Sequence, residues 1–258
     1  MSSAQLQERP LGRRAARRVG LTKVPQVTAA FWITKVLTTG MGEAASDYLG
    51  HTLDQVVAVG IGALLFAAAL VAQFSVKRYI AGVYWTAIVM VSVFGTMAAD
   101  ALHVGLGVPY TVSTAFFLVV LGAVFAVWYA VERTLSIHSI NTPRRELWYW
   151  LTVVTTFALG TAAGDLTAGT LGWGYLASGV VFAVVIAVPA LAHWKLGLNA
   201  VFAFWFAYIV TRPLGASFAD WMAAPHEHTG LGWGYGPVTA VWTVLIVLFV
   251  LLQRRSAD

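Results

Sequence analysis

Cysteine is absent from the 258-residue sequence, and charged residues make up only 10% of it. Without cysteine the chain can form neither a disulfide nor a thiolate metal site. Soluble globular domains carry roughly 25% charged residues, so this chain has too few to cover a surface that faces water. Hydrophobic residues account for 59% of the sequence. The composition therefore predicts a polytopic membrane protein, with room for about eight spans of roughly 20 residues each.

One pattern recurs four times without a gap: an aromatic residue and tryptophan, nine residues, glycine, three residues, a small residue and aspartate. Each copy leads through a short turn into an apolar segment that contains no charged residue. The apolar segments lie near 55–75, 111–131, 174–192 and 236–252. The four copies are FWITKVLTTGMGEAASD from residue 31, YWTAIVMVSVFGTMAAD from 84, YWLTVVTTFALGTAAGD from 149 and FWFAYIVTRPLGASFAD from 204.

The repeats predict an all-α membrane protein with eight transmembrane helices, arranged as four tandem two-helix hairpins. In each hairpin a motif helix carries the repeat, and an apolar scaffold helix follows it. Since the hairpins share one orientation, we expect them to be related by an axis along the membrane normal, with pseudo-fourfold or nested twofold symmetry. They form one domain over residues 25–253, with repeats at about 25–76, 80–132, 146–194 and 198–253.

Lysine and arginine indicate the orientation in the membrane. They precede the first span, lie in the links between hairpins and follow the last span, whereas the opposite turns contain none. Such an excess marks the cytoplasmic side, so both termini are expected in the cytoplasm, with residues 1–24 as a basic tail. The net charge of +5 is then a topology signal. The expected surroundings are a lipid bilayer, with no nucleic-acid partner, and a homo-oligomer stays open.

The repeat resembles that of a family of bacterial membrane proteins of unknown function. Members consist of four tandem repeats, each with two transmembrane segments and a characteristic tryptophan. The resemblance covers nearly the whole chain after residue 25. It implies the repeat architecture and a bacterial inner membrane, but no mechanism. For the tryptophans, interfacial anchoring or packing is preferred over stacking on a substrate. The residues that match the family's tryptophan are Trp32, Trp85, Trp150 and Trp205.

An aspartate ends every copy of the motif, at or near hydrocarbon depth. An ionisable residue inside a membrane is costly and is a functional-site hypothesis by default. The helix dipole disfavours an anion near a helix C-terminus, which argues against a capping role. Bonding to turn amides remains a structural alternative. We interpret the aspartates, assisted by Glu43, as a cation or proton site. They are Asp47, Asp100, Asp165 and Asp220.

Further polar residues share the helix face of the aspartates, since residues four apart lie on one face. Counting back in steps of four reaches Glu43, Thr39 and Lys35 in the first repeat and Arg212 in the fourth. The motif helices are therefore expected to line an inner cavity in which Lys35 and Arg212 tune the charge or gate the site. Candidate hydroxyl ligands are Thr39, Thr96 and Thr161.

Glycine and a small residue four positions later precede each aspartate. This small-xxx-small spacing lets helix backbones approach closely, so the four motif helices are expected to pack around one centre. The glycines are Gly42, Gly95, Gly160 and Gly215.

His226, Glu227 and His228 form a short cluster in the sequence after Asp220. Imidazole together with carboxylate suits Mn, Fe, Zn, Ni or Co better than Ca or Mg. Histidines are common in loops, however, and the spacing differs from that of a zinc-protease helix. The cluster is a candidate outer metal site of low specificity.

The favoured function is transport of a cation, with a divalent transition metal (Mn, Fe, Zn, Co or Ni) as the substrate. Export and proton coupling both stay open. One rival is a proton-coupled carrier of a small organic solute, and another is a membrane sensor or scaffold that transports nothing. The sequence contains no nucleophile elbow, phosphate loop or HExxH motif. Neither an enzymatic activity nor a tightly bound cofactor is therefore expected.

Overall fold

The computed structural model describes residues 22–255, and this range contains eight α-helices and no β-strand. The all-α prediction is thus confirmed for the described residues, while residues 1–21 of the predicted tail lie outside them. Short π-helical turns extend two helices, and two short 3₁₀ turns lie in loops. The helices are α2 (Ala29–Thr52), α3 (Gln55–Ser75), α4 (Ala81–Asp100), α5 (Tyr110–Glu132), α6 (Pro143–Asp165), α7 (Gly174–Leu196), α8 (Ala200–Ala223) and α9 (Tyr235–Arg255).

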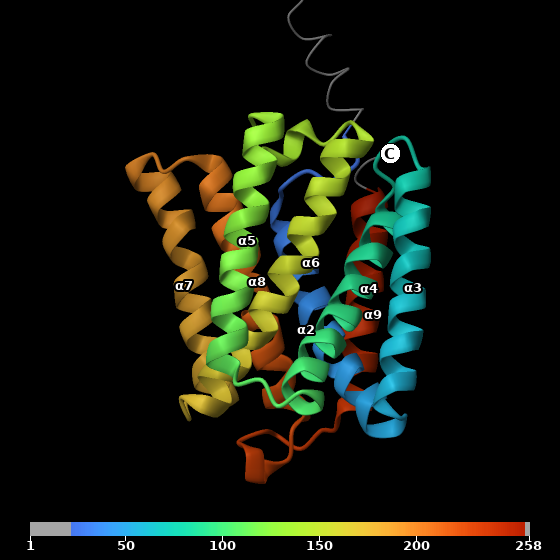
Figure 1. Ribbon diagram of the computed structural model, residues 1–258, viewed down its shortest axis with the longest axis vertical. Helices are drawn as coiled ribbons and strands as arrows, with labels where there is room; N and C mark the ends of the chain where they lie inside the picture. The colour runs from blue at the N-terminus through green and yellow to red at the C-terminus, as the bar shows by residue number, and fades with distance from the viewer. Residues whose placement is uncertain (1–21, 256–258) are drawn as a thin grey trace, which may run out of the picture.

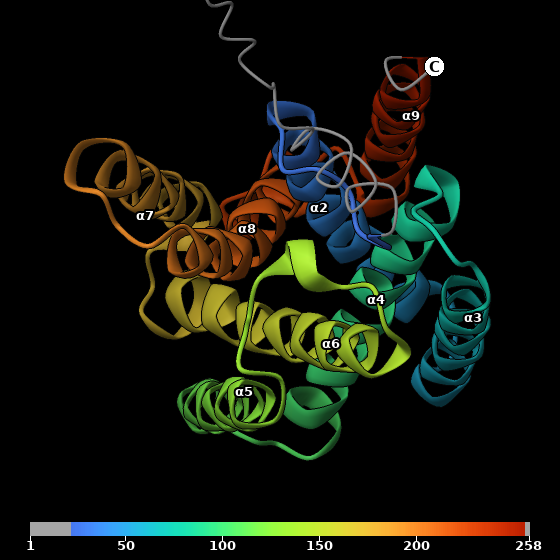
Figure 2. The same cartoon turned by 90° about the horizontal axis from the view of Figure 1, so that it is seen from above.

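The helices that carry the repeat motif, α2, α4, α6 and α8, form the centre of the molecule (Figure 2). Each packs against the next one along the chain, and α8 packs against α2, so the four close into a ring. The other helices lie outside this ring. Each outer helix packs mainly on the motif helix of the following repeat: α3 on α4, α5 on α6, α7 on α8, and α9 on α2. The predicted hairpin is therefore a unit of sequence, whereas packing joins neighbouring repeats.

Three of the four motif helices begin at a side chain that caps their first turn. The Thr28 hydroxyl accepts a hydrogen bond from the Phe31 amide, and the Thr142 hydroxyl accepts one from the Arg145 amide. The Asn199 side chain caps α8 in the same way. Such caps satisfy amides that have no partner inside the helix, and each stabilises a helix by about 1 kcal/mol.

The outer helices present apolar side chains to the outside. Val56, Leu64 and Val119 are 80%, 73% and 71% exposed. Among the described residues, the seven helices α3–α9 are long and apolar enough to cross a membrane. Helix α2 is not among them, because it carries Lys35, Glu43 and Asp47 within its 24 residues. The architecture is that of a multi-pass membrane protein, with seven spans identified by length and composition where eight were predicted.

The two ends of the bundle differ in charge. In Figure 1 the links α3–α4, α5–α6 and α7–α8 lie at the end where α2 begins and α9 ends, which we call the upper end. The links at the lower end contain no lysine or arginine. Those at the upper end contain Lys77, Arg78 and Arg133, and the adjacent helix ends carry Lys195, in the last turn of α7, and Arg144 and Arg145, in the first turn of α6.

A buried ion pair fastens the segment before α2 to the upper end. Lys23 Nζ lies 2.5 Å from Glu146 Oε2 and donates to the Phe74 carbonyl at 3.2 Å. Glu146 Oε1 accepts a hydrogen bond of 2.9 Å from Gln73 Nε2. The Lys23 amide also donates to the Ile140 carbonyl. These bonds connect the segment to α3, to α6 and to the link before α6.

The variant Glu146→Leu should be less stable by about 3 kcal/mol, since it leaves the Lys23 ammonium buried without its partner. We expect the melting temperature in detergent to fall by about 10 °C. The double variant Lys23→Met/Glu146→Leu should recover most of this loss. Glu227→Leu is the matched control, because the Glu227 side chain is 78% exposed. Equal melting temperatures for Glu146→Leu and the control would contradict the prediction.

Candidate functional site

Aromatic rings fill the centre of the bundle toward its upper end. The first aromatic residue of each motif packs against the motif tryptophan of a neighbouring repeat. Trp85, Trp150 and Trp205 are buried and Trp32 is partly buried, so all four tryptophans serve packing. The ring-centroid distances are 5.8 Å for Phe31–Trp85, 5.9 Å for Tyr84–Trp150, 6.1 Å for Tyr149–Trp205 and 5.6 Å for Phe204–Trp32.

The motif glycines lie where neighbouring motif helices come closest. Each glycine faces one residue of the adjoining motif helix, and this residue always stands eight positions before the aspartate of its own repeat. A side chain in place of the glycine would collide with that residue. The backbones can approach this closely only because no Cβ is present. An added Cβ would lie 1.9 Å from Ser92 Oγ at Gly42, 3.0 Å from Phe157 Cβ at Gly95, 2.4 Å from Arg212 Cγ at Gly160 and 2.0 Å from Thr39 Oγ1 at Gly215.

Below the aromatic rings, the side chains four, eight and twelve positions before each aspartate are buried and form successive layers. The aspartates form the last layer, toward the lower end. Asp220 is buried, while the other three are partly exposed. The inner layers are Lys35, Ile88, Val153 and Tyr208, then Thr39, Ser92, Phe157 and Arg212, then Glu43, Thr96, Thr161 and Ala216.

Arg212 connects all four repeats through one nitrogen. Its Nη2 pairs with Glu43 Oε2 and donates to Thr96 Oγ1 at 2.5 Å and to Thr161 Oγ1 at 2.7 Å. The fourth repeat has Ala216 at the position of Glu43, Thr96 and Thr161. The small side chain of Ala216 leaves space in this layer. The Arg212 side chain, which begins one helical turn nearer the upper end, fills that space. The two threonine hydroxyls thus bind Arg212.

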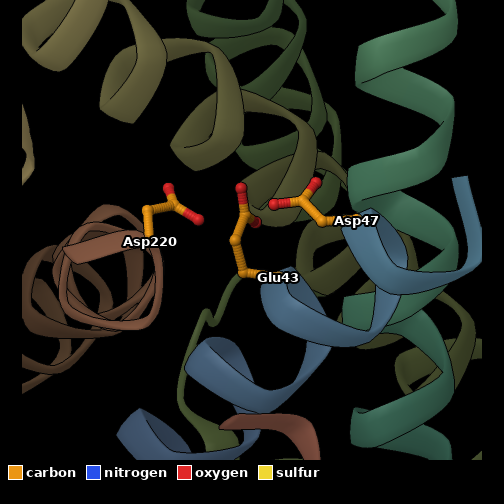
Figure 3. Close-up of side chains that lie close together, drawn as sticks. All are labelled: Glu43, Asp47 and Asp220. Carbon is orange, nitrogen blue, oxygen red and sulfur yellow. The ribbon is translucent and has the colours of Figure 1, made fainter. Parts of the chain in front are cut away.

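Three carboxylates meet beside this network. Glu43, Asp47 and Asp220 each offer one oxygen, and these atoms lie within 4.8 Å of one another. Figure 3 shows the Glu43 carboxylate between the other two. The bonds of Glu43 to Arg212 and Thr96 both involve Oε2. Asp220 Oδ1 is buried and has no hydrogen-bond partner among residues 22–255. We call Glu43, Asp47 and Asp220 the acidic cluster. Their three oxygens lie close enough together to hold a metal ion.

Asp100 and Asp165 are not part of the acidic cluster. Each is the last residue of its α-helix, and the chain continues as a π-helical turn, Ala101–Gly105 or Leu166–Thr170. In contrast, α2 and α8 continue as α-helices beyond Asp47 and Asp220. Asp100 and Asp165 still lie near Glu43 and Arg212, so they add further acidic groups around the cluster.

The two basic residues of the interior have different surroundings. Arg212 contacts the acidic cluster directly, as described above. Lys35 Nζ lies 4.4 Å from the ring centroid of Phe157 and 4.3 Å from that of Tyr208. The Thr39 hydroxyl donates to the Val36 and Thr211 carbonyls and thus joins α2 to α8. Lys35 and Thr39 therefore lie deeper than the acidic cluster and do not contact it.

The predicted outer cluster lies on the exposed loop between α8 and α9. His228 Nε2 lies 3.9 Å from Glu227 Oε1, and both side chains are exposed. His226 Nδ1 instead bonds to the Gly230 carbonyl, at 2.9 Å. Within the described part of the chain, these residues do not assemble with the acidic cluster.

Three tyrosines near the aspartates were not singled out from the sequence. Each begins, or nearly begins, an outer helix and lies near the aspartates of more than one repeat. A fixed spacing could have revealed two of them, because Tyr110 and Tyr175 stand ten residues after Asp100 and Asp165. The nearby aspartates are Asp100, Asp165 and Asp47 for Tyr110, Asp165, Asp220 and Asp47 for Tyr175, and Asp220 and Asp47 for Tyr235.

The repeats match a known family model, described as "Repeat of Unknown Function (DUF347)". The match comprises residues 30–79, 83–134, 148–197 and 203–258. It confirms the resemblance inferred from the repeated motif. No curated protein and no solved structure matches the chain.

Proposed function

The chain belongs to this family of membrane repeats of unknown function, and we propose that it transports a divalent metal cation across a bacterial inner membrane. The observation that carries the proposal is the acidic cluster in the interior of the helix ring. Glu43, Asp47 and Asp220 bring three oxygens within 4.8 Å, and Asp220 Oδ1 is buried without a hydrogen bond among the described residues. Buried carboxylates this close repel one another unless a cation or proton lies between them.

The balance of charge in the interior also favours a cation. Together, the inner layers and the aspartate layer contain Glu43 and the four aspartates but only two basic side chains, Lys35 and Arg212. Intramembrane charges usually face a bundle interior and pair with one another or with a transported ion. A divalent cation would offset the part of the negative charge that Arg212 leaves uncompensated.

The carboxylate oxygens favour some divalent metals over others as the proposed substrate. Oxygen ligands suit Mg, Ca and Mn, whereas imidazole and thiolate suit Zn, Ni and Cu. No histidine joins the acidic cluster within residues 22–255, and the chain has no cysteine. Of the five metals expected from the sequence, Mn²⁺ is therefore the substrate that we propose.

We further propose that α2 is the eighth span and that the four hairpins have one orientation around a pseudo-fourfold axis along the membrane normal. The ring of aromatic contacts and the ring of glycine contacts, each linking every repeat to its neighbours, support this symmetry. The charged side chains of α2 at the inner layers are buried, so they need not face lipid. By the excess of lysine and arginine, the upper end is cytoplasmic, and the acidic cluster lies toward the outside.

Calorimetry on the purified protein in detergent tests the metal site. Mn²⁺ should bind saturably, and Fe²⁺, Co²⁺, Ni²⁺ and Zn²⁺ would be compared under the same conditions. The double variant Asp47→Asn/Asp220→Asn should lose this binding, because two of three ligands lose their charge. Asp54→Asn is the matched control. Its carboxylate caps α3 from an exposed position, and asparagine caps a helix equally well.

Uptake of Mn²⁺ into vesicles that contain the protein then tests transport. Saturable binding that both the double variant and the control retain would contradict the proposed ligands. If the folded wild type binds no metal but moves an organic solute in a pH-dependent way, the protein is instead a proton-coupled carrier. If it moves neither, the sensor or scaffold function takes its place.

A further inference from the structure

The side chain of Lys35 has no polar partner in the interior. It is 0% exposed, and Nζ makes no hydrogen bond to any residue of the described range 22–255. The faces of Phe157 and Tyr208 lie 4.4 Å and 4.3 Å from Nζ, measured to the ring centroids. Burying an ammonium ion without compensation is very costly. The two rings supply that compensation, since an aromatic face attracts a cation most strongly where water is excluded.

The Phe157 ring also approaches Arg212, which is bound to Glu43 of the acidic cluster. The same ring lies 5.9 Å from Arg212 Cζ, so it is close to both interior cations. Lys35 precedes Glu43 by eight residues, which is roughly 12 Å of helix rise. Between the acidic cluster and the upper end, the next place that holds a cation is therefore the space between Phe157 and Tyr208.

We propose that Phe157 and Tyr208 form an aromatic cage for an ammonium group, which Lys35 fills as a ligand tethered to the chain. In the proposed transport function, this tethered cation blocks the passage of a metal ion between the acidic cluster and the upper end. Aromatic cages recognise ammonium ions, whereas Mn²⁺ prefers oxygen ligands, so a metal ion does not replace Lys35 in the cage. The binding of an ammonium group depends only on the geometry of the cage. Only the block of metal-ion passage rests on the proposed transport function.

Lys35→Ala removes the part of the side chain that corresponds to n-propylammonium. A buried cavity left by truncation can bind a small molecule of the missing shape. At near-saturating concentration, n-propylammonium should raise the melting temperature of this variant by about 3 °C or more and leave that of the wild type unchanged. The neutral isostere 1-propanol should have no such effect. Equal responses to the two compounds, or an equal response after adding Phe157→Leu, would overturn the cage.

A double-mutant cycle provides a second test, which does not need Lys35→Ala to fold. Lys35→Met keeps a long unbranched chain in the cage without charge. Phe157→Leu should lower the melting temperature by about 4 °C more when Lys35 is present than when Met replaces it. Purely apolar packing of Phe157 predicts equal decreases, and that result would contradict the assignment.

Vesicle flux separates this inference from the proposed function. Lys35→Ala should pass Mn²⁺ faster than the wild type, and n-propylammonium should return the rate to the wild-type level. If Mn²⁺ binds and moves but n-propylammonium changes neither flux nor stability, the cage is wrong while the transport proposal stands. If n-propylammonium binds but Mn²⁺ never does, the cage stands and the transport proposal fails.

Discussion

Arg212→Met is expected to destabilise the protein by about 5 kcal/mol, the upper part of the range for breaking a buried ion pair. Arg212 is 0% exposed, and its Nη2 bonds to Glu43, Thr96 and Thr161. Methionine fills a similar volume but leaves the Glu43 carboxylate buried next to two other carboxylates. Since Glu43 is only 4% exposed, water can do little to solvate the carboxylate that is left without its partner, and the loss should be larger than for a pair near the surface.

The result can be measured as a fall of the melting temperature in detergent by about 10–20 °C, if folded protein is obtained at all. Glu43→Gln/Arg212→Met should recover much of the loss, because it removes both charges of the pair. Arg144→Met is the matched control. Its side chain is 66% exposed, and its ion pair with Glu132 should contribute at most about 1 kcal/mol. A loss for Arg212→Met no larger than for this control would show that the pair does not hold the repeats together.

The inner faces of the motif helices could be predicted from the sequence, but their partners could not. Spacing of four residues is enough to place Glu43 and Asp47 on one face of a helix. It gives no information about which helix lies opposite. Glu43 pairs with Arg212, 169 residues away, and the outer helix of each repeat packs on the motif helix of the next one. Contacts of this kind depend on how the ring closes, a property of the whole chain.

The composition of the acidic cluster also depends on structure that the motif does not encode. All four aspartates occupy the same position in the repeat, yet only Asp47 and Asp220 join Glu43. The motif helices of Asp100 and Asp165 change there from α to π geometry, whereas α2 and α8 remain α-helical. Such π-helical turns are frequent at functional sites but have no simple sequence signal. The identity of the neighbouring residue matters as well, because Glu43 occurs only in the first repeat and is flanked by Asp47 of its own helix and Asp220 of the adjoining helix α8.

Gly160→Leu is expected to prevent the ring of motif helices from closing, so that little or no folded protein is obtained. An added Cβ at Gly160 would lie 2.4 Å from Arg212 Cγ, 2.5 Å from Arg212 Cβ and 3.0 Å from Pro213 Cδ. These atoms belong to the base of one side chain and to a rigid ring, so they cannot move aside without moving α8. Overpacking alone costs about 1–3 kcal/mol, and displacing Arg212 adds the loss of its pair with Glu43.

The same substitution at Gly122 is the matched control for this prediction. Gly122 lies within α5, is exposed, and has nothing within 4 Å of an added Cβ. Leucine is a better helix former than glycine, so Gly122→Leu should fold with the yield and melting temperature of the wild type or better. The smaller change Gly160→Ala should give an intermediate loss. If Gly160→Leu matches Gly122→Leu in yield and melting temperature, the motif glycines are not what brings the helices together, and the ring must close through its aromatic contacts instead.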